Sequence, residues 1–355
     1  MVGDVAKIAN FVPMRSILII RLSSLGDVVL ATPLVRQLHR TYPRARIDVA
    51  VSSRFAGVWQ NNPRVAHVWP ILTTSATDAT SDEIKLKILE SLSGECGGQY
   101  DLIVDLQHNL RSAALRHGLG STVVLAPKHR LEKLALVWLK KRPAKTQSIV
   151  SRYRKLLEHL PLVGDIEPCE VWLPEERRDG VYLNAQPARG ALHRIAIAPG
   201  AQHATKRWPI AKYAQLVREL TVRGNKEIVL IGGPADVDIC SAVAEASGVD
   251  VLRADGSLSV ESTVRALDTC QAIITNDSGV MHLASARRLP IVAIFGSTVQ
   301  EFGFAPYAVP FKIVEHNVSC RPCSHIGRAS CPKGHFLCMV SIETEQVLSA
   351  LAALI

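Results

Sequence analysis

A carboxylate stands where an apolar run gives way to a turn near the start of the chain. The run SILIIRL is followed by SSLGDVVLATP (residues 23–33), which places Gly26 and Asp27 at the turn. A carboxylate at such a turn can cap the helix that follows, and it can also act as a general base toward an attacking hydroxyl. On this stretch alone the cap is the simpler interpretation, so a catalytic role depends on what the rest of the chain supplies.

Two further loops have the composition of anion-binding sites. NDSGVMHLA (276–284) follows the apolar run QAIIT and opens a helical pattern, and a helix N-terminus presents free backbone N–H groups to an anion. PGAQHATKRWP (199–209) also follows an apolar run and offers a hydroxyl and a cation to a phosphate. Each stretch is equally consistent with a helix cap or a solvated loop. The candidate anion ligands are Thr205, Lys206, Asp277, Ser278, Gly279 and His282.

A third loop suits a nucleoside. In GGPADVD (232–238), Gly233 and Asp236 are the candidates for contact with ribose hydroxyls. The chain lacks the glycine spacing of a P-loop and has no GxGxxG after its first strand, which disfavours both of those nucleotide sites. The three loops together predict a site for a nucleotide-sugar. In it, Lys206 and a helix N-terminus stabilise the leaving diphosphate without a metal, and Asp27 deprotonates the acceptor hydroxyl.

The elements that position these loops follow an α/β pattern. Short β-branched runs alternate with helical patterns, as is typical of parallel βαβ units, and ligands bind at the carboxyl ends of parallel strands. The alternation weakens between Leu173 and Leu192, where the chain is polar and rich in Pro and Gly. For 355 residues this predicts two doubly wound domains, residues 1–180 and 190–340, followed by a final helix at 341–355.

The net charge of +9 is concentrated in one segment. Between Arg111 and Lys155, Glu132 is the one acidic residue among twelve basic ones. Such a patch attracts a polyanion, whether nucleic acid, an anionic membrane surface or a phosphorylated substrate, or it is a solvated helix face. Aromatic residues make up only 5% of the chain and no stacking series accompanies the patch, which disfavours nucleic acid. No apolar run has the length of a membrane span and no secretory signal is evident, so a cytoplasmic protein is expected.

Four of the eight cysteines lie close together in CRPCSHIGRASCPKGHFLC. This spacing predicts a structural zinc or iron site at residues 320–338, with free or paired thiols as the alternative. His325 and His335 are possible substitute ligands. The remaining cysteines are expected to be small buried residues, and no metal is expected in catalysis. The four candidate metal ligands are Cys320, Cys323, Cys331 and Cys338.

The set of motifs, in this order, resembles glycosyltransferase family 9, the lipopolysaccharide heptosyltransferases. The stretches that carry the resemblance are IIRLSSLGDVVLATPLVRQL, VDLQHNLRSAAL, APGAQHATKRWPIAKYAQLV, LIGGPAD and NDSGVMHLASARRLPIVAIFGST. The resemblance implies a GT-B fold, in which two Rossmann-like domains face each other across a cleft and the final helix returns to the N-terminal domain. It further implies inverting transfer of heptose from ADP-L-glycero-D-manno-heptose to the Kdo–lipid A core, with Asp27 as the base.

The resemblance also implies where the acceptor binds and where the enzyme works. The acceptor is anionic, which suits the basic segment, and the enzyme is expected at the cytosolic face of the inner membrane. Two positions depart from the family pattern, Val280 in place of Pro and Ser148 in place of His. The alternatives are another donor or a protein acceptor, a nucleotide-sugar epimerase, and a basic nucleic-acid-binding protein with a four-cysteine module. The candidate acceptor ligands are Gly26, Gln107, Arg111, Lys140, Lys141 and Arg142.

Overall fold

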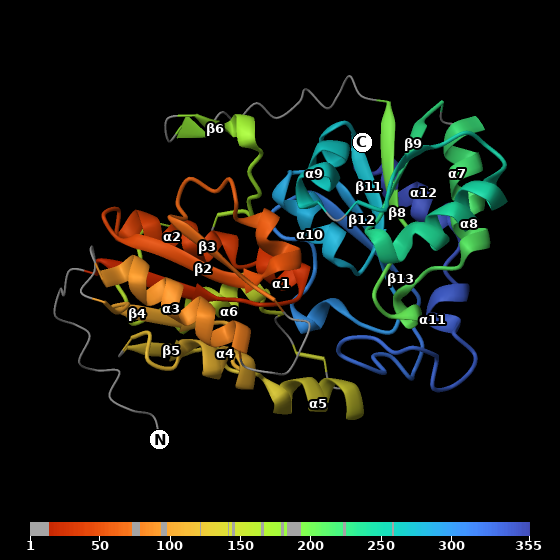
Figure 1. The fold of residues 1–355 in the computed structure, drawn as a ribbon. Helices are drawn as coiled ribbons and strands as arrows, with labels where there is room; N and C mark the ends of the chain where they lie inside the picture. The colour runs from red at the N-terminus through yellow and green to blue at the C-terminus, as the bar shows by residue number, and fades with distance from the viewer. Residues whose placement is uncertain are drawn as a thin grey trace. The chain divides into compact units, whose positions relative to one another are not determined.

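The chain forms two compact units, each built on its own parallel sheet (Figure 1). Unit 1 comprises Met1–Lys128, Ile149–Glu167 and Val171–Tyr182, and unit 2 comprises His129–Ser148, Pro168–Glu170 and Leu183–Ile355. The structure, a computed structural model, describes residues 14–72, 79–93, 98–120, 122–140, 142–143, 146–164, 167–178, 181–182, 193–222, 225–257 and 259–355.

The sheet of unit 1 has the strand order β3-β2-β1-β4-β5, and all of its strands are parallel. All five residues of the central strand β1 are buried, as expected where helices cover both faces of a parallel sheet. The carboxyl ends of β1 and β4 lie side by side, because Ile20 pairs with Asp105. The strands are β1 (Ser16–Ile20), β2 (Arg46–Ser52), β3 (His67–Ile71), β4 (Leu102–Asp105) and β5 (Val123–Leu125).

Helices of unit 1 follow its strands in the order that the sequence predicts. Helices α3 and α4 pack over one side of the sheet, where Ile88 and Leu115 join a buried cluster with Leu18 and Ile103. The helices are α1 (Leu25–Val29), α2 (Thr32–Thr41), α3 (Ala79–Ser93), α4 (Leu110–Arg116), α6 (Ile149–Leu156), and the 3-10 turns η2 (Ser53–Val58) and η3 (Pro174–Glu176). A two-stranded antiparallel ribbon, β6 (Arg177–Arg178) with β7 (Val181–Tyr182), completes the unit.

Unit 2 repeats this plan with a six-stranded parallel sheet in the order β10-β9-β8-β11-β12-β13. The strand order reverses between β8 and β11, whose carboxyl ends lie side by side, and ligands bind at such a point in doubly wound sheets. The strands are β8 (Arg194–Ala198), β9 (Glu227–Ile231), β10 (Leu252–Ala254), β11 (Ala272–Asn276), β12 (Ile291–Phe295) and β13 (Phe311–Glu315).

Helices cover both faces of this second sheet. Helices α7 and α12 pack on one face and α9 and α10 on the other (Figure 1). The helices are α5 (Arg130–Trp138), α7 (Ile210–Val222), α8 (Val237–Ser247), α9 (Val260–Asp268), α10 (Gly279–Ala286), α11 (Leu337–Val340) and α12 (Thr344–Ala352). The 3-10 turns are η5 (Ala204–Lys206), η6 (Pro234–Asp236) and η7 (Gln300–Phe302). The predicted α/β class, with two doubly wound parallel sheets, is confirmed.

One segment groups with a different unit from the one predicted. The final helix contributes Val347 and Leu351 of α12 to the core of unit 2, and its packing toward the N-terminal domain stays a prediction. The segment His129–Ser148 was placed in the N-terminal domain, but it groups with unit 2, where Leu136 of α5 packs against Val299 and Phe302. In the part of the chain that the structure describes, no helix is long and apolar enough to cross a membrane.

Candidate active site

Asp27 lies in the first turn of α1, immediately beyond strand β1. The Ser24 hydroxyl and the Ser24 backbone N–H donate to one Asp27 carboxylate oxygen, at 2.8 and 3.2 Å. The other oxygen pairs with the Arg21 guanidinium at 2.6 Å. The capping role that the sequence left open is therefore present, and it holds the carboxylate in a fixed orientation.

These contacts set the ionisation state of Asp27. Burial raises the pKa of Asp27, but the charge of Arg21 and the hydrogen bonds from Arg21 and Ser24 lower it more, so the net pKa lies below its usual value. Tyr153 of α6 interacts electrostatically with both groups, and burial raises the pKa of its phenol, so it stays protonated. Asp27 is therefore a carboxylate at every pH at which the protein is expected to work, as a general base must be.

Sequence reasoning missed Arg21 as a site residue. Its guanidinium also donates to the Leu106 carbonyl just beyond β4, which ties the Asp27 ion pair to the neighbouring strand end. The only signal in the sequence is a basic residue that follows the apolar run SILII. A cation is not expected there unless it has a partner, because an unpaired charge at the edge of a buried sheet is costly.

Of the predicted acceptor ligands in unit 1, Gln107 has a positioning role. Its side-chain oxygen accepts hydrogen bonds from the backbone N–H groups of Leu22 and Ser23, both at 3.1 Å. This fixes the loop that leads into Asp27. Gly26 is buried inside α1, whereas Arg111 is exposed in the first turn of α4. Arg111 is therefore the predicted acceptor ligand in this unit whose charge faces solvent.

Lys140, a predicted acceptor ligand, bonds to backbone carbonyls of its own unit. Its ammonium donates to the carbonyls of Val137, Cys320 and Pro322, at 2.6, 3.0 and 2.6 Å. Lys140 therefore holds the cysteine segment against the end of α5. A count of charges along the chain cannot reveal this, because the partners lie about 180 residues away.

Arg142, another predicted ligand of this group, does not add a free acceptor cation. The Arg142 guanidinium lies 3.3 Å from the Glu301 carboxylate and 4.0 Å from the Glu315 carboxylate, so its charge is largely compensated. Lys141 lies outside the described residues. The basic segment predicted as one acceptor surface is therefore divided between the two units and partly neutralised.

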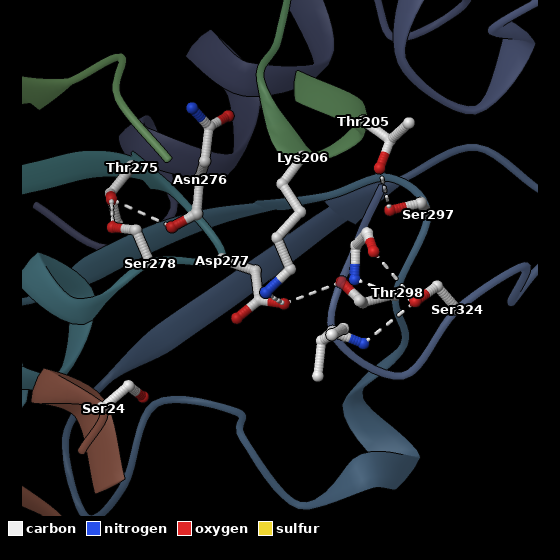
Figure 2. A network of polar contacts seen from close by, with 12 residues as sticks. Ser24, Thr205, Lys206, Thr275, Asn276, Asp277, Ser278, Ser297, Thr298 and Ser324 are labelled. Carbon is white, nitrogen blue, oxygen red and sulfur yellow. Dashed lines mark hydrogen bonds and ion pairs between the residues drawn. The ribbon is translucent and has the colours of Figure 1, made fainter. Parts of the chain in front are cut away.

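In unit 2, Lys206 and Asp277 form an ion pair where their strand-end loops meet. Lys206 Nζ lies 2.7 Å from an Asp277 carboxylate oxygen, and the Thr298 hydroxyl donates to the same oxygen at 2.7 Å. Figure 2 shows these three side chains converging. A carboxylate repels a phosphate, so Asp277 is better placed to orient Lys206 than to bind a diphosphate itself. Thr298 is a site residue that the sequence analysis missed.

The backbone N–H groups at the start of α10 provide the second element of an anion site. Ser278 is the N-cap of this eight-residue helix, and its hydroxyl lies 3.3 Å from that of Thr275 (Figure 2). Ser278 and Gly279 are partly exposed, so the first turn is accessible. His282 is buried one turn further on, with its ring against Phe304, which places it in the helix packing behind that turn.

Asn276 explains why these loops keep their relative positions. Its amide donates to the Pro199 carbonyl at 2.8 Å, and its oxygen accepts from the Trp208 N–H and the Tyr213 hydroxyl. All of these groups are buried. Asn276 therefore has a structural role, because it joins the ends of β8 and β11 to helix α7. Asp277, Ser278 and Gly279 follow it in the loop that leads into α10.

Thr205 supports the Lys206 loop from behind. Its hydroxyl accepts from the Arg328 N–H at 2.8 Å and from the Ser297 hydroxyl at 3.0 Å, and it lies 3.2 Å from the Arg328 carbonyl. The side chain is 2% exposed. Although Thr205 was predicted to contact the diphosphate, its hydrogen-bonding capacity is used within the protein, so it positions Lys206.

The nucleoside loop is built around Asp236. The Gly233 N–H donates to the Asp236 carboxylate at 3.0 Å in a capping box. A methyl group at Gly200 would lie 2.1 Å from the other carboxylate oxygen, and one at Gly232 would lie 2.6 Å from the Asp236 Cβ. The two glycines let the carboxylate lie against the strand-end backbone, so Asp236 is held at the carboxyl edge of the sheet, and its contact with ribose stays a prediction.

We expect Gly200→Ala to destabilise unit 2 by about 1–3 kcal/mol, because its new methyl group overlaps the Asp236 carboxylate. Gly233→Ala is the matched control, since a methyl group there lies at an ordinary 3.9 Å from the same side chain. Denaturant unfolding of both variants measures the difference. Equal stability of the two would mean that Asp236 moves aside freely and is not held in place.

Arg321, from the cysteine segment, is the buried centre of a network that the sequence analysis also missed. Its guanidinium donates to the carbonyls of Gly296 and Thr298, at 2.5 and 2.9 Å, and to the Glu315 carboxylate at 2.8 Å. Because the Thr298 hydroxyl bonds Asp277, Arg321 supports the Lys206 ion pair through the backbone of residues 296–298.

We expect Arg321→Met to lower the free energy of unfolding by about 3–5 kcal/mol, the usual result of breaking a buried ion pair. Arg328→Met, at an exposed position of the same segment, should cost less than about 1 kcal/mol. Guanidinium unfolding monitored by circular dichroism compares the two. A loss of similar size in both variants would contradict the central position given to Arg321.

The cysteine segment does not form the predicted metal centre. Cys320 Sγ lies 3.8 Å from His335 Nε2, and the four thiols are close enough to influence one another. Burial raises the pKa of Cys338 to about 11. Across the described ranges, no three His, Cys, Asp or Glu side chains converge closely enough to hold a metal ion.

The geometry provides complementary chemistry in the two units. Unit 1 presents an ionised, oriented carboxylate at the end of β1, and unit 2 presents an oriented lysine beside a helix N-terminus and a carboxylate that suits a ribose. These are the groups needed to activate a hydroxyl and to stabilise a departing nucleoside diphosphate.

Comparisons with known proteins place the chain in a family. The family model of glycosyltransferase family 9 (heptosyltransferase) matches residues 89–332. Lipopolysaccharide heptosyltransferase 3 of Escherichia coli is 24% identical over 280 residues, which cover 77% of this chain and 81% of that protein.

Two solved structures share the fold. The glycosyl transferase family 9 structure from Veillonella parvula has a TM-score of 0.74 at 20% identity and covers 96% of this chain and 97% of that one. E. coli heptosyltransferase WaaC with ADP has a TM-score of 0.67 at 20% identity, with 96% and 100% covered. Together with the two parallel sheets, these likenesses confirm the predicted GT-B type of fold. The family model matches more than half of this chain. The chain therefore belongs to glycosyltransferase family 9, the heptosyltransferases, and is a glycosyltransferase.

Proposed function

We propose that this enzyme transfers a heptose from an ADP-heptose donor to a hydroxyl of the Kdo–lipid A core of lipopolysaccharide. Asp27 accepts the proton of the acceptor hydroxyl as its oxygen forms a bond to the anomeric carbon. The bond from that carbon to the diphosphate breaks, and ADP leaves with the electron pair. Attack from the side opposite the leaving group inverts the anomeric centre.

The observation that carries this proposal is the state of Asp27. Its carboxylate is kept ionised by Arg21 and oriented by Ser24, and 14% of the side chain remains exposed. A carboxylate that served only as a cap would not need a guanidinium as a second partner, because the cap is complete with the hydrogen bonds from Ser24. The Arg21 pairing is therefore best explained by a requirement for a permanently ionised base.

In unit 2 the proposal gives Lys206 the role of neutralising charge on the leaving diphosphate, together with the N–H groups at the start of α10. Asp277, Thr298 and Thr205 position the lysine, and Asp236 contacts the ribose. The adenine nucleotide is supported by the ADP in the solved WaaC structure, whose fold the chain shares. The lipopolysaccharide acceptor is supported by the curated relative from E. coli.

The location and the acceptor surface are proposed on the same basis. The acceptor is a membrane lipid, so the enzyme is placed in the cytoplasm at the inner membrane surface, with Arg111, exposed in the first turn of α4, as an acceptor ligand. No nucleic acid is part of this function. The proposal assigns no cofactor to the reaction.

A coupled assay of nucleotide release tests the proposal. Purified protein is mixed with a heptose-free core acceptor and with heptose or hexose donors carrying ADP, UDP or GDP. ADP release that depends on both the ADP-heptose donor and the acceptor is the expected result. Release from a UDP or GDP donor would favour the alternative donor, and conversion of the donor without any acceptor would favour an epimerase. Salt-sensitive DNA binding without transfer would support the nucleic-acid alternative.

A further inference from the structure

Helix α5 exposes an unusual number of large apolar side chains. Leu131 is 82% exposed, Leu134 51%, Trp138 77% and Leu139 72%. Positions 131, 134 and 138 are spaced by three and four residues, so they lie on one side of the helix, and Leu139 continues this face at its end. We refer to these four residues as the α5 face. Contiguous exposed apolar residues of this kind mark an interaction surface.

The helix that carries this face is anchored on its other side. Leu136 is buried against Val299 and Phe302 of unit 2, and Val137 packs beside them. At the end of the helix, Lys140 is held by the carbonyls of Cys320 and Pro322. The exposed leucines therefore belong to a helix with a fixed inner side, and they are free to contact something outside this unit.

The surroundings of the α5 face are positively charged. Arg130 is exposed at the start of the helix, whereas Lys133 lies on the anchored side with Leu136 and Val137, and Lys140 follows the end of the helix. The ammonium of Lys140 bonds to neutral carbonyls, so its charge is not cancelled by an acid in those contacts. Glu132 is the single acidic residue of the helix, and it pairs with His129 at 3.0 Å. The face thus combines apolar contact area with an excess of cations.

We propose that the α5 face docks the enzyme on an anionic lipid bilayer, with the helix lying along the surface. The leucines and Trp138 enter the boundary between headgroups and acyl chains, where tryptophan is enriched, and Arg130 contacts anionic headgroups. A helix of nine residues is too short to span the bilayer. A second copy of the chain is a poorer occupant, because it would bring two cationic surrounds together.

This inference extends the proposed function, whose acceptor is a membrane lipid, but its test requires neither donor nor acceptor. The chain supplies its own probe. Of its five tryptophans, Trp138 is the exposed one, whereas Trp59, Trp69, Trp172 and Trp208 are each at most 9% exposed. Quenching of tryptophan fluorescence by brominated lipid therefore reports contact between the α5 face and the acyl chains.

The full-length protein is titrated with two kinds of vesicle, both with brominated acyl chains. The anionic vesicles contain phosphatidylethanolamine and phosphatidylglycerol, and the neutral vesicles contain phosphatidylcholine alone. With the anionic vesicles only, the tryptophan emission is expected to shift to shorter wavelength and to be quenched. Both changes should be absent in Trp138→Phe. Cosedimentation should show that Leu131→Ser with Leu134→Ser weakens vesicle binding at least about tenfold. Arg130→Glu should weaken it at least about fivefold. Val222→Ser, a change at a 75% exposed apolar residue of α7, should bind like the wild type.

Three results would overturn the inference. One is wild-type vesicle binding by the double leucine variant, and another is equal binding to the neutral vesicles. The third is a wild-type dimer that dissociates in the leucine variant while no vesicle binding is detected, which would assign the face to a second copy. Vesicle binding without any glycosyl transfer would leave this inference standing and count against the proposed function alone.

Discussion

Replacing Asp27 with Asn is expected to reduce the rate of transfer about 100- to 10,000-fold, the range associated with loss of a general base. The amide keeps the shape of the side chain and can still accept from Ser24, so the fold of α1 should survive. It cannot accept a proton from the acceptor. Affinity for ADP should stay close to that of the wild type, because the nucleotide ligands lie in unit 2. Steady-state kinetics and calorimetry measure the two effects separately.

A carboxylate elsewhere in unit 1 provides the control. Glu83 pairs with Lys87 on the exposed side of α3, so Glu83→Gln should leave both the rate and the affinity unchanged. If Asp27→Asn and Glu83→Gln transfer heptose at similar rates, Asp27 is a cap and not the base.

The pH dependence of the reaction provides an independent check on the same residue. A base works only while ionised, and the pKa of Asp27 lies below its usual value, so its titration should not limit the rate above about pH 5. In Arg21→Met the charge that lowers this pKa is removed and burial, which raises it, remains. The acid limb of the rate profile should therefore move to higher pH. An unchanged acid limb would mean that Arg21 does not control the base.

Lys206→Met is expected to lower kcat/KM for the donor about 100- to 1,000-fold, the usual cost of removing one group that stabilises developing charge. The Lys206 ammonium lies 2.7 Å from the Asp277 carboxylate. A bound diphosphate must therefore either replace Asp277 as the partner of this ammonium or bind it together with Asp277. Lys212→Met is the control, because this lysine of α7 pairs with Glu343 on the surface. Initial rates at varied donor concentration separate binding from turnover.

A substitution of Asp277, the partner of Lys206, tests whether this carboxylate orients the lysine or contacts the donor. If Asp277 only orients the lysine, Asp277→Asn should cost much less than Lys206→Met, and the double variant should be no worse than Lys206→Met alone. Additive losses would show that Asp277 contacts the donor in its own right. Wild-type kinetics in Lys206→Met would remove the lysine from the diphosphate site.

Much of the fold is predictable from local sequence, for physical reasons that particular strands make clear. β1, β4 and β11 are buried, largely apolar runs. β4 and β11 end in polar residues at the carboxyl edge, and β1 is followed there by Arg21. The edge strand β3 was not recognised, because HVWPI contains Pro70 and alternates in burial, which only an edge position tolerates. The positions of the candidate loops follow from the strands, so the sequence places Asp27, Lys206 and Ser278 just beyond the carboxyl ends of strands.

What the sequence could not show depends on contacts between distant residues. Arg21, Thr298 and Arg321 are ordinary polar residues until the fold places them beside Asp27, Asp277 and Glu315. The same limit applies to the basic segment, because a count of cations does not show their partners. Arg142 pairs with Glu301, and Lys140 donates to backbone carbonyls. The assignment of α5 to unit 2 also depends on contacts that the sequence does not show.

The central claim is that this family 9 enzyme moves a heptose from ADP to a lipopolysaccharide core hydroxyl with Asp27 as the base. The most direct measurement is mass spectrometry of the acceptor after incubation with ADP-heptose, together with quantification of ADP. Wild-type protein should add one heptose per ADP released, and Asp27→Asn should bind the donor but form product at least about 100-fold more slowly. An Asp27→Asn variant that forms the product at the wild-type rate, or a wild type that forms none, would contradict the claim.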